Sequence, residues 1–318
     1  MQIKNVLFVG LNYHGYTDAI ADEIRSEYKC HVDYIDIQPR SFFWNVLKVL
    51  WPKIFWLLLS NYHKYHFSKC SDISYERVFF LQAHQVSDNN FSLLIKLQSE
   101  AKFVLYNWDS LKNHDYLSKV RYFDRVFTFD PADAIAHKFD YLPLFCSREL
   151  QGFEQSASKE IFMIGNIVNP LRLDAVNTFQ KFCVEKRLCF KTHLRVSVLV
   201  LLKLSLAKYG LKNLELRDAS KAKIQSFYES SSVVFDWANH AQVGLTMRAA
   251  EALGTGKMLI TNCAYLKNAG YASPGQVLVI DDRFDFSEVE NFINSGSTAF
   301  QPNEELYIQN FVMALFKD

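Results

Sequence analysis

Residues that can bind the phosphates of a nucleotide cluster in one segment, QVGLTMRAAEALGTGKMLIT, from Gln242 to Thr261. Gly244 allows a backbone to approach a ligand closely, and Thr246 and Arg248 stand at the start of a predicted helix whose amide dipoles attract anions. Glu251, about one turn further on, offers a carboxylate that accepts hydrogen bonds from ribose hydroxyls. A loop, a helix and a buried strand in this order are typical of nucleotide sites in α/β proteins.

The charge of a diphosphate requires several donors. Backbone amides around Leu245 and Thr246, together with the guanidinium of Arg248, can neutralise it. Arg172, just after a predicted loop at Gly165, adds a second positive charge. A surface charge or a structural ion pair is the alternative for Arg248, but its neighbours in the segment favour ligand binding. For Arg172 both interpretations stay open.

A polar loop, DWANHAQ, precedes the segment. Asp236 ends a predicted buried strand, and ligands of parallel sheets bind at the carboxyl edge of the strands. Its carboxylate either contacts the ligand or shapes the loop by accepting hydrogen bonds from neighbouring amides. His240 and Gln242 lie in the same loop and can reach the ligand or its phosphate, with a solvated loop position as the alternative.

Two residues of the first half are candidates for a general base. His14, in the strand-to-helix turn GLNYHG, can take a proton from a substrate hydroxyl near neutral pH. Asp109, in NWDS, follows a predicted strand and is the rival candidate. A solvated loop histidine and a helix cap are the respective alternatives. Asp130 and Asp133 are expected to form a turn and the first turn of a helix.

Strands and helices alternate along the chain, which predicts an α/β protein with parallel sheets covered on both faces. Thr17 or Asp18 can cap the first helix. In the first half we expect strands at 6–9, 32–37, 77–81, 103–106 and 125–129, and helices at 17–28, 91–99 and 131–137. In the second half we expect strands at 161–164, 214–216, 232–235, 258–260 and 276–280, and helices at 172–185, 194–208, 221–229, 286–294 and 304–316.

The chain has 318 residues, a length that favours two domains. We expect an N-terminal domain over 1–147, a polar linker over 148–159, a C-terminal domain over 160–302 and a closing helix over 303–318.

Lys plus Arg (35) balances Asp plus Glu (34), which argues against nucleic acid as a partner. Six cysteines without a CxxC pair, and a start without a cleavable signal sequence, favour a reduced cytoplasmic protein.

The segment from Arg40 to Lys69 combines cations with aromatic residues. No acidic residue occurs between Asp36 and Asp72, whereas Trp44, Trp51 and Trp56 lie among several lysines. This chemistry favours docking at an anionic membrane surface, with core helices as the alternative. Lys48, Pro52 and Lys53 argue against a spanning helix. The segment from 191 to 212 repeats the apolar-basic pattern.

Four segments resemble bacterial glycosyltransferases that assemble capsule, exopolysaccharide or lipopolysaccharide, including O-antigen. They are residues 242–261, FMIGNIVNPLR at 162–172, LYNWDS at 105–110 and FDRVFTFDPADA at 123–134. The resemblance implies the GT-B fold, in which two Rossmann-like domains face each other across a cleft. It further implies a nucleotide-sugar on the C-terminal domain, an acceptor on the N-terminal domain, and no metal or other cofactor.

The resemblance indicates a glycosyltransferase that moves a hexosyl or related sugar to a lipid-linked or lipopolysaccharide glycan at the inner face of the bacterial cytoplasmic membrane. Many related retaining enzymes carry a Glu seven residues before the second Glu, whereas Gln242 lies nine before Glu251. The donor base, the sugar, the acceptor and the stereochemistry therefore stay open. A sugar-nucleotide epimerase of the same fold and a non-catalytic binding module are the alternatives.

Overall fold

The computed structural model describes residues 3–13, 15–39, 41–153, 156–206, 213–238, 243–281, 283–295 and 300–317. These residues form two compact units. The first comprises Met1–Leu142 together with Ile308–Asp318, and the second comprises Pro143–Tyr307. Each unit contains one six-stranded parallel sheet, as the alternation of strands and helices predicts. Residues 148–153, expected to begin the linker, belong to the second unit, where Leu150 is buried in the core.

The sheet of the first unit has the strand order β2-β1-β3-β4-β5-β6. The order reverses direction between β1 and β3, and such a switch point is where open parallel sheets bind ligands. The strands are β1 (Asn5–Gly10), β2 (His31–Asp36), β3 (Arg77–Leu81), β4 (Lys102–Asn107), β5 (Arg125–Thr128) and β6 (Asp140–Tyr141).

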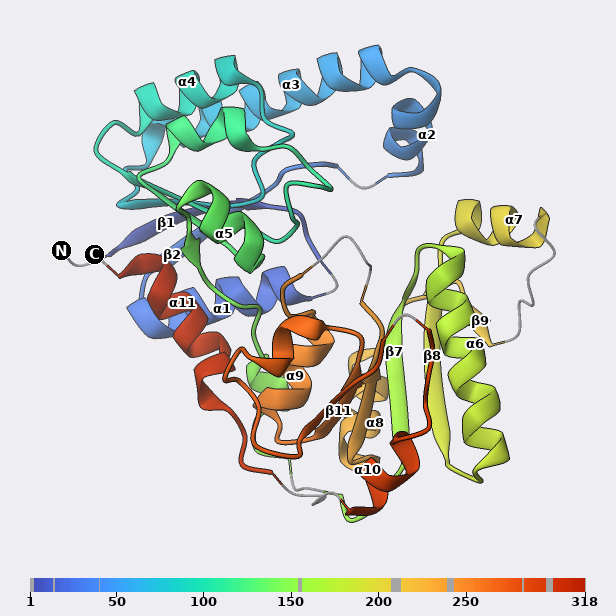
Figure 1. Cartoon of the computed structure of the whole chain (residues 1–318). Coiled ribbons are helices and arrows are strands. Elements are labelled where there is room, and N and C mark those ends of the chain that lie inside the picture. Colours follow the sequence, from blue (N-terminus) through green and yellow to red (C-terminus); the bar gives the residue numbers. More distant parts are fainter. Residues whose placement is uncertain are drawn as a thin grey trace. The chain divides into compact units, whose positions relative to one another are not determined.

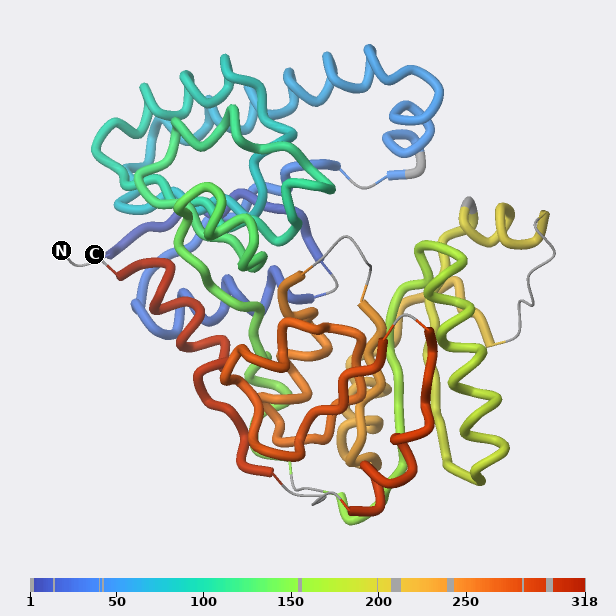
Figure 2. The backbone as a smooth tube through the Cα atoms, in the orientation of Figure 1, coloured from blue at the N-terminus to red at the C-terminus, as the bar shows by residue number. Residues whose placement is uncertain are grey.

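Helices cover both faces of this sheet (Figure 1). On one face, Phe67 and Phe91 of the helices α3 and α4 pack against Phe80 of β3. On the other, α11 lies beside α1 (Figure 2). Phe316 of α11 contacts Phe79 of β3 with ring centroids 5.9 Å apart. The helices are α1 (Tyr16–Tyr28), α2 (Phe42–Leu50), α3 (Pro52–Ser68), α4 (Asp88–Leu97), α5 (Pro131–His137) and α11 (Ile308–Phe316), with short 3-10 turns η1 (Lys69–Asp72) and η2 (Leu117–Tyr122).

The expected cap of α1 is wrong, because the helix starts one residue earlier than predicted. Its N-cap is Gly15, whose φ of 84° is a left-handed conformation that glycine adopts without strain. The Thr17 hydroxyl instead donates to the Leu11 carbonyl at 2.6 Å and accepts from the Tyr13 amide at 3.0 Å. Thr17 therefore ties down the loop that follows β1.

The sheet of the second unit has the order β9-β8-β7-β10-β11-β12. This is the doubly wound order of dinucleotide-binding folds, with its switch point between β7 and β10. The strands are β7 (Ile161–Ile167), β8 (Phe190–Val196), β9 (Leu214–Glu215), β10 (Val233–Asp236), β11 (Met258–Thr261) and β12 (Val277–Val279). The helices are α6 (Pro170–Glu185), α7 (Val198–Leu206), α8 (Lys221–Ser230), α9 (Met247–Gly254) and α10 (Val289–Ser295), with 3-10 turns η3 (Arg148–Leu150), η4 (Ala264–Lys267) and η5 (Glu304–Leu306).

Successive side chains of β7 point to opposite faces of this sheet. Ile161 and Met163 belong to a cluster that includes residues of α6 and α10, whereas Phe162 and Ile164 belong to a cluster with residues of α8 and α9. Two helical layers therefore cover the sheet, as its all-parallel strands require.

Several element boundaries differ from the sequence predictions. The helix expected at 194–208 is instead the end of β8 followed by α7, because β8 pairs with β7 over its whole length. β7 continues to Ile167, so that Gly165 lies inside a strand and not in a loop. The closing helix is interrupted at Tyr307, between η5 and α11.

Candidate functional site

Arg172 and Asp236 meet at the switch point of the second sheet. The Asn169 side chain caps α6 by accepting from the Arg172 amide at 2.9 Å, which places Arg172 in the first turn of the helix. Its guanidinium Nη2 lies 3.9 Å from Oδ1 of Asp236, the last residue of β10. The Nε of Arg172 is buried and has no hydrogen-bond partner among the described residues. Burial lowers the pKa of this guanidinium, while Asp236 raises it.

Gly165 makes room for this arginine. A Cβ at position 165 would lie 2.9 Å from Nη2 of Arg172, closer than real contacts of a Cβ allow. Any larger residue at position 165 would displace the guanidinium, so the position of Arg172 depends on the absence of a side chain there.

Asp236 is almost completely buried and is held by Thr246. The Thr246 hydroxyl donates to Oδ2 of Asp236 at 2.7 Å and accepts from the Ala249 amide at 3.0 Å, which makes Thr246 the N-cap of α9. Burial raises the pKa of Asp236, and Arg172 and Thr246 lower it. These contacts fix the start of α9 against the end of β10, and they favour a structural role of Asp236 in shaping the loop.

Arg248 and Glu251 form an ion pair within α9, close to Tyr228 of α8. Glu251 is 1 % exposed, and the Tyr228 hydroxyl donates to its Oε2 at 2.8 Å. Arg248 Nη1 also donates to the Tyr228 hydroxyl at 3.3 Å. Glu251 is therefore surrounded by protein partners, and the sequence offered no sign that Tyr228 would be one of them.

The remaining donor candidates fall into two groups. Leu245 and Gly244 are buried, and the Gly244 carbonyl accepts from the Cys263 thiol at 3.8 Å. Only backbone groups of these two residues can contribute to a ligand site. His240 and Gln242, like the base candidate His14 of the first unit, lie outside the described residues.

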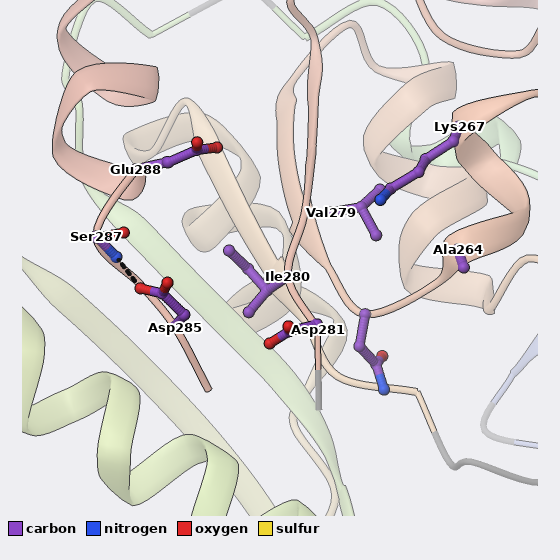
Figure 3. Close-up of a pocket in the computed structure, with 9 residues that line it drawn as sticks. Ala264, Lys267, Val279, Ile280, Asp281, Asp285, Ser287 and Glu288 are labelled. Carbon is purple, nitrogen blue, oxygen red and sulfur yellow. Dashed lines mark hydrogen bonds between the residues drawn. The ribbon is translucent and has the colours of Figure 1, made fainter. Parts of the chain in front are cut away.

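An open pocket of about 410 Å³ lies at the carboxyl ends of β11 and β12, along the same edge of the sheet. Figure 3 shows Asp281 and Asp285 on one side of it and Lys267 on the other. Asn262 ties the pocket to the loop after β10, because it accepts from the Ala238 amide at 2.6 Å and donates to the Ala238 carbonyl at 3.2 Å. The lining residues are Asn262, Ala264, Lys267, Val279, Ile280, Asp281, Asp285, Ser287 and Glu288.

In the first unit, Asp109 lies two residues after β4, at the carboxyl edge of the sheet. No helix starts there, since residues 111–113 form a turn and η2 begins at Leu117, so a helix cap does not explain this aspartate. Gln82, directly after β3, donates from Nε2 to Oδ2 of Asp109 at 3.0 Å. Sequence reasoning missed Gln82, although the strand-end criterion used for Asp109 also applies to it.

The other two acidic candidates of the first unit belong to α5. Asp130 caps this helix by accepting from the Ala132 amide at 2.9 Å, and Asp133 lies in its first turn, as predicted. Over the described ranges, no three His, Cys, Asp or Glu side chains are grouped so that they could hold a metal ion.

Comparison with known proteins places the fold. No protein-family model and no curated protein sequence matches the chain. An alpha-glucosyltransferase, solved with UDP and a 13-mer DNA containing an A:G mismatch, superposes with a TM-score of 0.59 at 11% identity, covering 92% of this chain and 90% of its own. The catalytic domain of Arabidopsis thaliana starch synthase IV, bound to ADP and acarbose, gives 0.58 at 9% identity, covering 100% and 96%. The chain has the GT-B fold.

The same fold also occurs in an enzyme of another class. UDP-GlcNAc 2-epimerase from Neisseria meningitidis, bound to UDP-GlcNAc, superposes with a TM-score of 0.53 at 8% identity and covers 98% of both chains. The structural neighbours thus include both transferases and epimerases, and the identities are low enough that the comparison concerns the fold alone.

Proposed function

We propose that the protein is a glycosyltransferase that binds a nucleotide-sugar at the switch point of the second sheet. The observation that carries this proposal is Arg172, whose Nε is buried without a partner among the described residues beside the N-terminus of α9. A buried unpaired N–H is costly unless a ligand accepts from it. Phosphate oxygens suit a guanidinium and a helix N-terminus alike.

In this proposal the diphosphate is bound by N–H groups that point at it, and not by an excess of positive charge at the site. Asp236 and Glu251 offset the charges of Arg172 and Arg248, with which they are paired. The N–H groups of Arg172 and the backbone amides at Leu245 and Thr246 then supply hydrogen bonds that strengthen as the leaving group gains charge. A protein-bound metal is not part of the proposal, because these groups perform its role.

The transfer itself exchanges one bond for another. The acceptor oxygen bonds to the anomeric carbon of the donor while the bond from that carbon to the phosphate oxygen breaks, and the nucleotide leaves with the electron pair. The pocket beside Asn262 offers the donor sugar hydrogen-bonding groups of both kinds, among them Lys267, Asp281 and Ser287.

We further propose that the acceptor is a lipid-linked or lipopolysaccharide glycan, which the protein binds at the inner face of a bacterial cytoplasmic membrane. The support is the apolar face of α2 and α3. Phe55, Leu59, His63 and Phe67 form the buried stripe of α3 at every fourth position. What we call the apolar face consists of exposed apolar residues of α2, of α3 and of the junction between them, which are 47–64 % exposed: Phe43, Val49, Leu50, Trp51, Ile54, Trp56 and Leu57.

Two features fit this face to an anionic bilayer. Lys48 and Lys53 are exposed beside it, and the sequence holds no acidic residue between Asp36 and Asp72. Tryptophans with lysines are typical of helices that lie in the membrane interface. In the second unit, α7 also exposes Val198, Leu202 and Leu206. Within the described ranges, no helix is long and apolar enough to cross a membrane.

Nucleotide binding is tested by thermal shift with UDP-, GDP-, CMP- and dTDP-sugars. We expect one of these donors to raise the Tm of the wild-type protein, since a ligand of the folded state stabilises it. Arg172→Met should lower the affinity for that donor about 10- to 100-fold, which is the contribution expected of a hydrogen bond to a charged group. Arg187→Met, which changes an exposed arginine after the opposite end of α6, should leave the affinity unchanged. A panel in which no donor raises the Tm would overturn the proposal.

Membrane binding is tested by flotation with vesicles of phosphatidylcholine, with and without phosphatidylglycerol. The wild-type protein should float with the anionic vesicles. The double variant Trp51→Ser/Leu57→Ser should lower the partition coefficient onto these vesicles at least about tenfold, because each substitution removes more than about 1 kcal/mol of the free energy gained by burying an apolar side chain. Ile135→Ser is the control, since Ile135 is 83% exposed on α5, outside the apolar face. Equal flotation of the double variant and the wild type would contradict the assigned face.

The epimerase neighbour supports one alternative. An epimerase returns an isomeric sugar nucleotide and needs no membrane, whereas a transferase releases the nucleotide and elongates an acceptor. Chromatography of the donor after incubation separates these outcomes. A non-catalytic binding module would bind the donor and leave it intact.

A further inference from the structure

The Asp109 carboxylate is held from both sides by side chains of the first unit. Its Oδ2 accepts from Gln82 Nε2 at 3.0 Å and lies 3.8 Å from His114 Nε2. Its Oδ1 accepts from Asn113 Nδ2 at 3.4 Å. A carboxylate on a loop is thereby kept in one orientation.

Gln82 is an unusual residue in both its backbone and its side chain. Its φ of 71° lies in the left-handed region, which costs energy for a residue other than glycine and often marks a functional site. Its amide donates to the Tyr106 carbonyl of β4 at 3.0 Å, so the conformation is fixed by the sheet. The side chain is 3% exposed, and its Oε1 is buried with no partner among the described residues.

His84 fixes the ring of His114. The two imidazoles are stacked, with centroids 4.1 Å apart and planes 5° from parallel. Burial lowers the pKa of His84 to about 4, and the neighbouring His114 and Lys48 lower it to a smaller extent. His84 is therefore neutral at pH 7 and stacks on His114 as an uncharged ring. The amides of Asn113 and His114 donate to the Ser110 carbonyl at 2.9 and 3.1 Å, which closes the turn that carries both side chains.

These groups lie where a ligand of this sheet is expected. β3 and β4 are neighbours, both end at the same edge, and the switch point lies between β1 and β3. The Asp109 side chain is 21% exposed, so a substrate hydroxyl can reach it, whereas Gln82 is buried behind it. The arrangement is that of an accessible base with buried support.

We propose that Asp109 is the general base of the transfer and that Gln82 and His114, the latter stacked on His84, position its carboxylate. This inference rests on the proposed function. The acceptor hydroxyl gives its proton to Asp109 as its oxygen bonds to the anomeric carbon, and the departing nucleotide takes the electron pair of the bond that breaks. Asp109 then returns the proton to water. Gln82 and His114 act through Asp109 and do not themselves react.

The test uses the full chain and the sugar nucleotide that gives the largest thermal shift. Nucleotide release is measured with water alone and with octyl glucoside, octyl galactoside and octyl N-acetylglucosaminide as acceptors. Asp109→Asn should lower kcat about 100- to 10,000-fold, the usual contribution of a general base. Gln82→Met should lower kcat about 10- to 100-fold, because a displaced catalytic group loses its alignment. The donor KM and the thermal shift should be unchanged in both.

A double variant separates positioning from a general structural effect. In the Asp109→Asn background, Gln82→Met and His114→Phe should have no further effect on kcat, since their role is exerted through the carboxylate. His114→Phe keeps an aromatic ring beside His84 and removes both ring nitrogens, including the Nε2 that lies near Asp109. Gln85→Met makes the same substitution at a partly buried glutamine three residues further along the chain. It is the matched control and should retain wild-type kcat.

Three results would overturn the inference: an Asp109→Asn variant with wild-type kcat, a Gln82→Met variant with wild-type kcat, or equal losses from Gln82→Met with and without Asp109. A wild-type chain that releases no nucleotide under any of these conditions contradicts the proposed function itself. The two failures are therefore distinguishable.

Discussion

Arg248→Met should lower the free energy of unfolding by about 3–5 kcal/mol, because removing one partner of a buried ion pair leaves the other charge uncompensated. Glu251 is 1 % exposed, so water cannot replace the guanidinium. The Tyr228 hydroxyl still donates to its Oε2, but a neutral donor does not replace the charge of a lost cation. Urea denaturation of the wild type and the variant at pH 7 measures the difference.

Two further variants serve as controls, one that removes both charges of the pair and one that breaks an exposed ion pair. Arg248→Met/Glu251→Gln should recover most of the loss, since a neutral amide in place of the carboxylate needs no counter-charge. Lys186→Met breaks the exposed pair with Glu290 and should change the stability little. If Arg248→Met is as harmless as Lys186→Met, the pair does not contribute to the fold, and Arg248 is held in place by other contacts.

The stability of the protein should fall as the pH decreases from about 6.5 to about 4, with His63 as a principal cause. His63 is fully buried on α3, its Nε2 bonds to the Ile37 carbonyl at 2.7 Å, and its Nδ1 has no partner among the described residues. Burial lowers the pKa of His63 from 6.5 to about 4. Between these values the unfolded chain binds a proton that the folded chain does not, so acid favours unfolding. The contribution reaches about 3 kcal/mol at the lower end of this range.

Urea denaturation at pH 7, 6 and 5 checks this dependence. His63→Gln keeps a donor for the Ile37 carbonyl and removes the titrating ring, so its stability should change less between pH 7 and pH 5 than that of the wild type. His137→Gln, at an exposed position on α5, should keep the wild-type slope. An unchanged slope in His63→Gln would show that other groups dominate the acid response.

Much of the fold was predictable because its strands are short, apolar and bounded by polar residues. The limits 77–81 and 131–137 agree with β3 and α5 at both ends. β8 was missed because its sequence, FKTHLRV, has polar residues at several positions, and its strand conformation depends on pairing with β7. Pairing of this kind is a tertiary interaction that local patterns do not encode.

The candidate site was less predictable than the fold. Strand ends identified Asp236 and Asp109, since the carboxyl edge of a parallel sheet collects such residues. The pairing of Thr246 with Asp236, or of Tyr228 with Glu251, was not foreseeable, because each depends on how a helix packs on the sheet. Gln82 shows the same limit, since its importance arises from a left-handed backbone and a contact 27 residues away.

The chain returns to its first unit only after it has built the second. Residues Ile308–Phe316 form α11, and Phe311 and Phe316 contact Tyr106 and Phe79 of the first sheet. The ribosome must therefore synthesise all of residues 143–307 before the first unit can cover that face. Until then the nascent first unit exposes apolar surface, and domains with such surface are prone to aggregate during synthesis. The first unit therefore completes its fold only after the second unit has been synthesised.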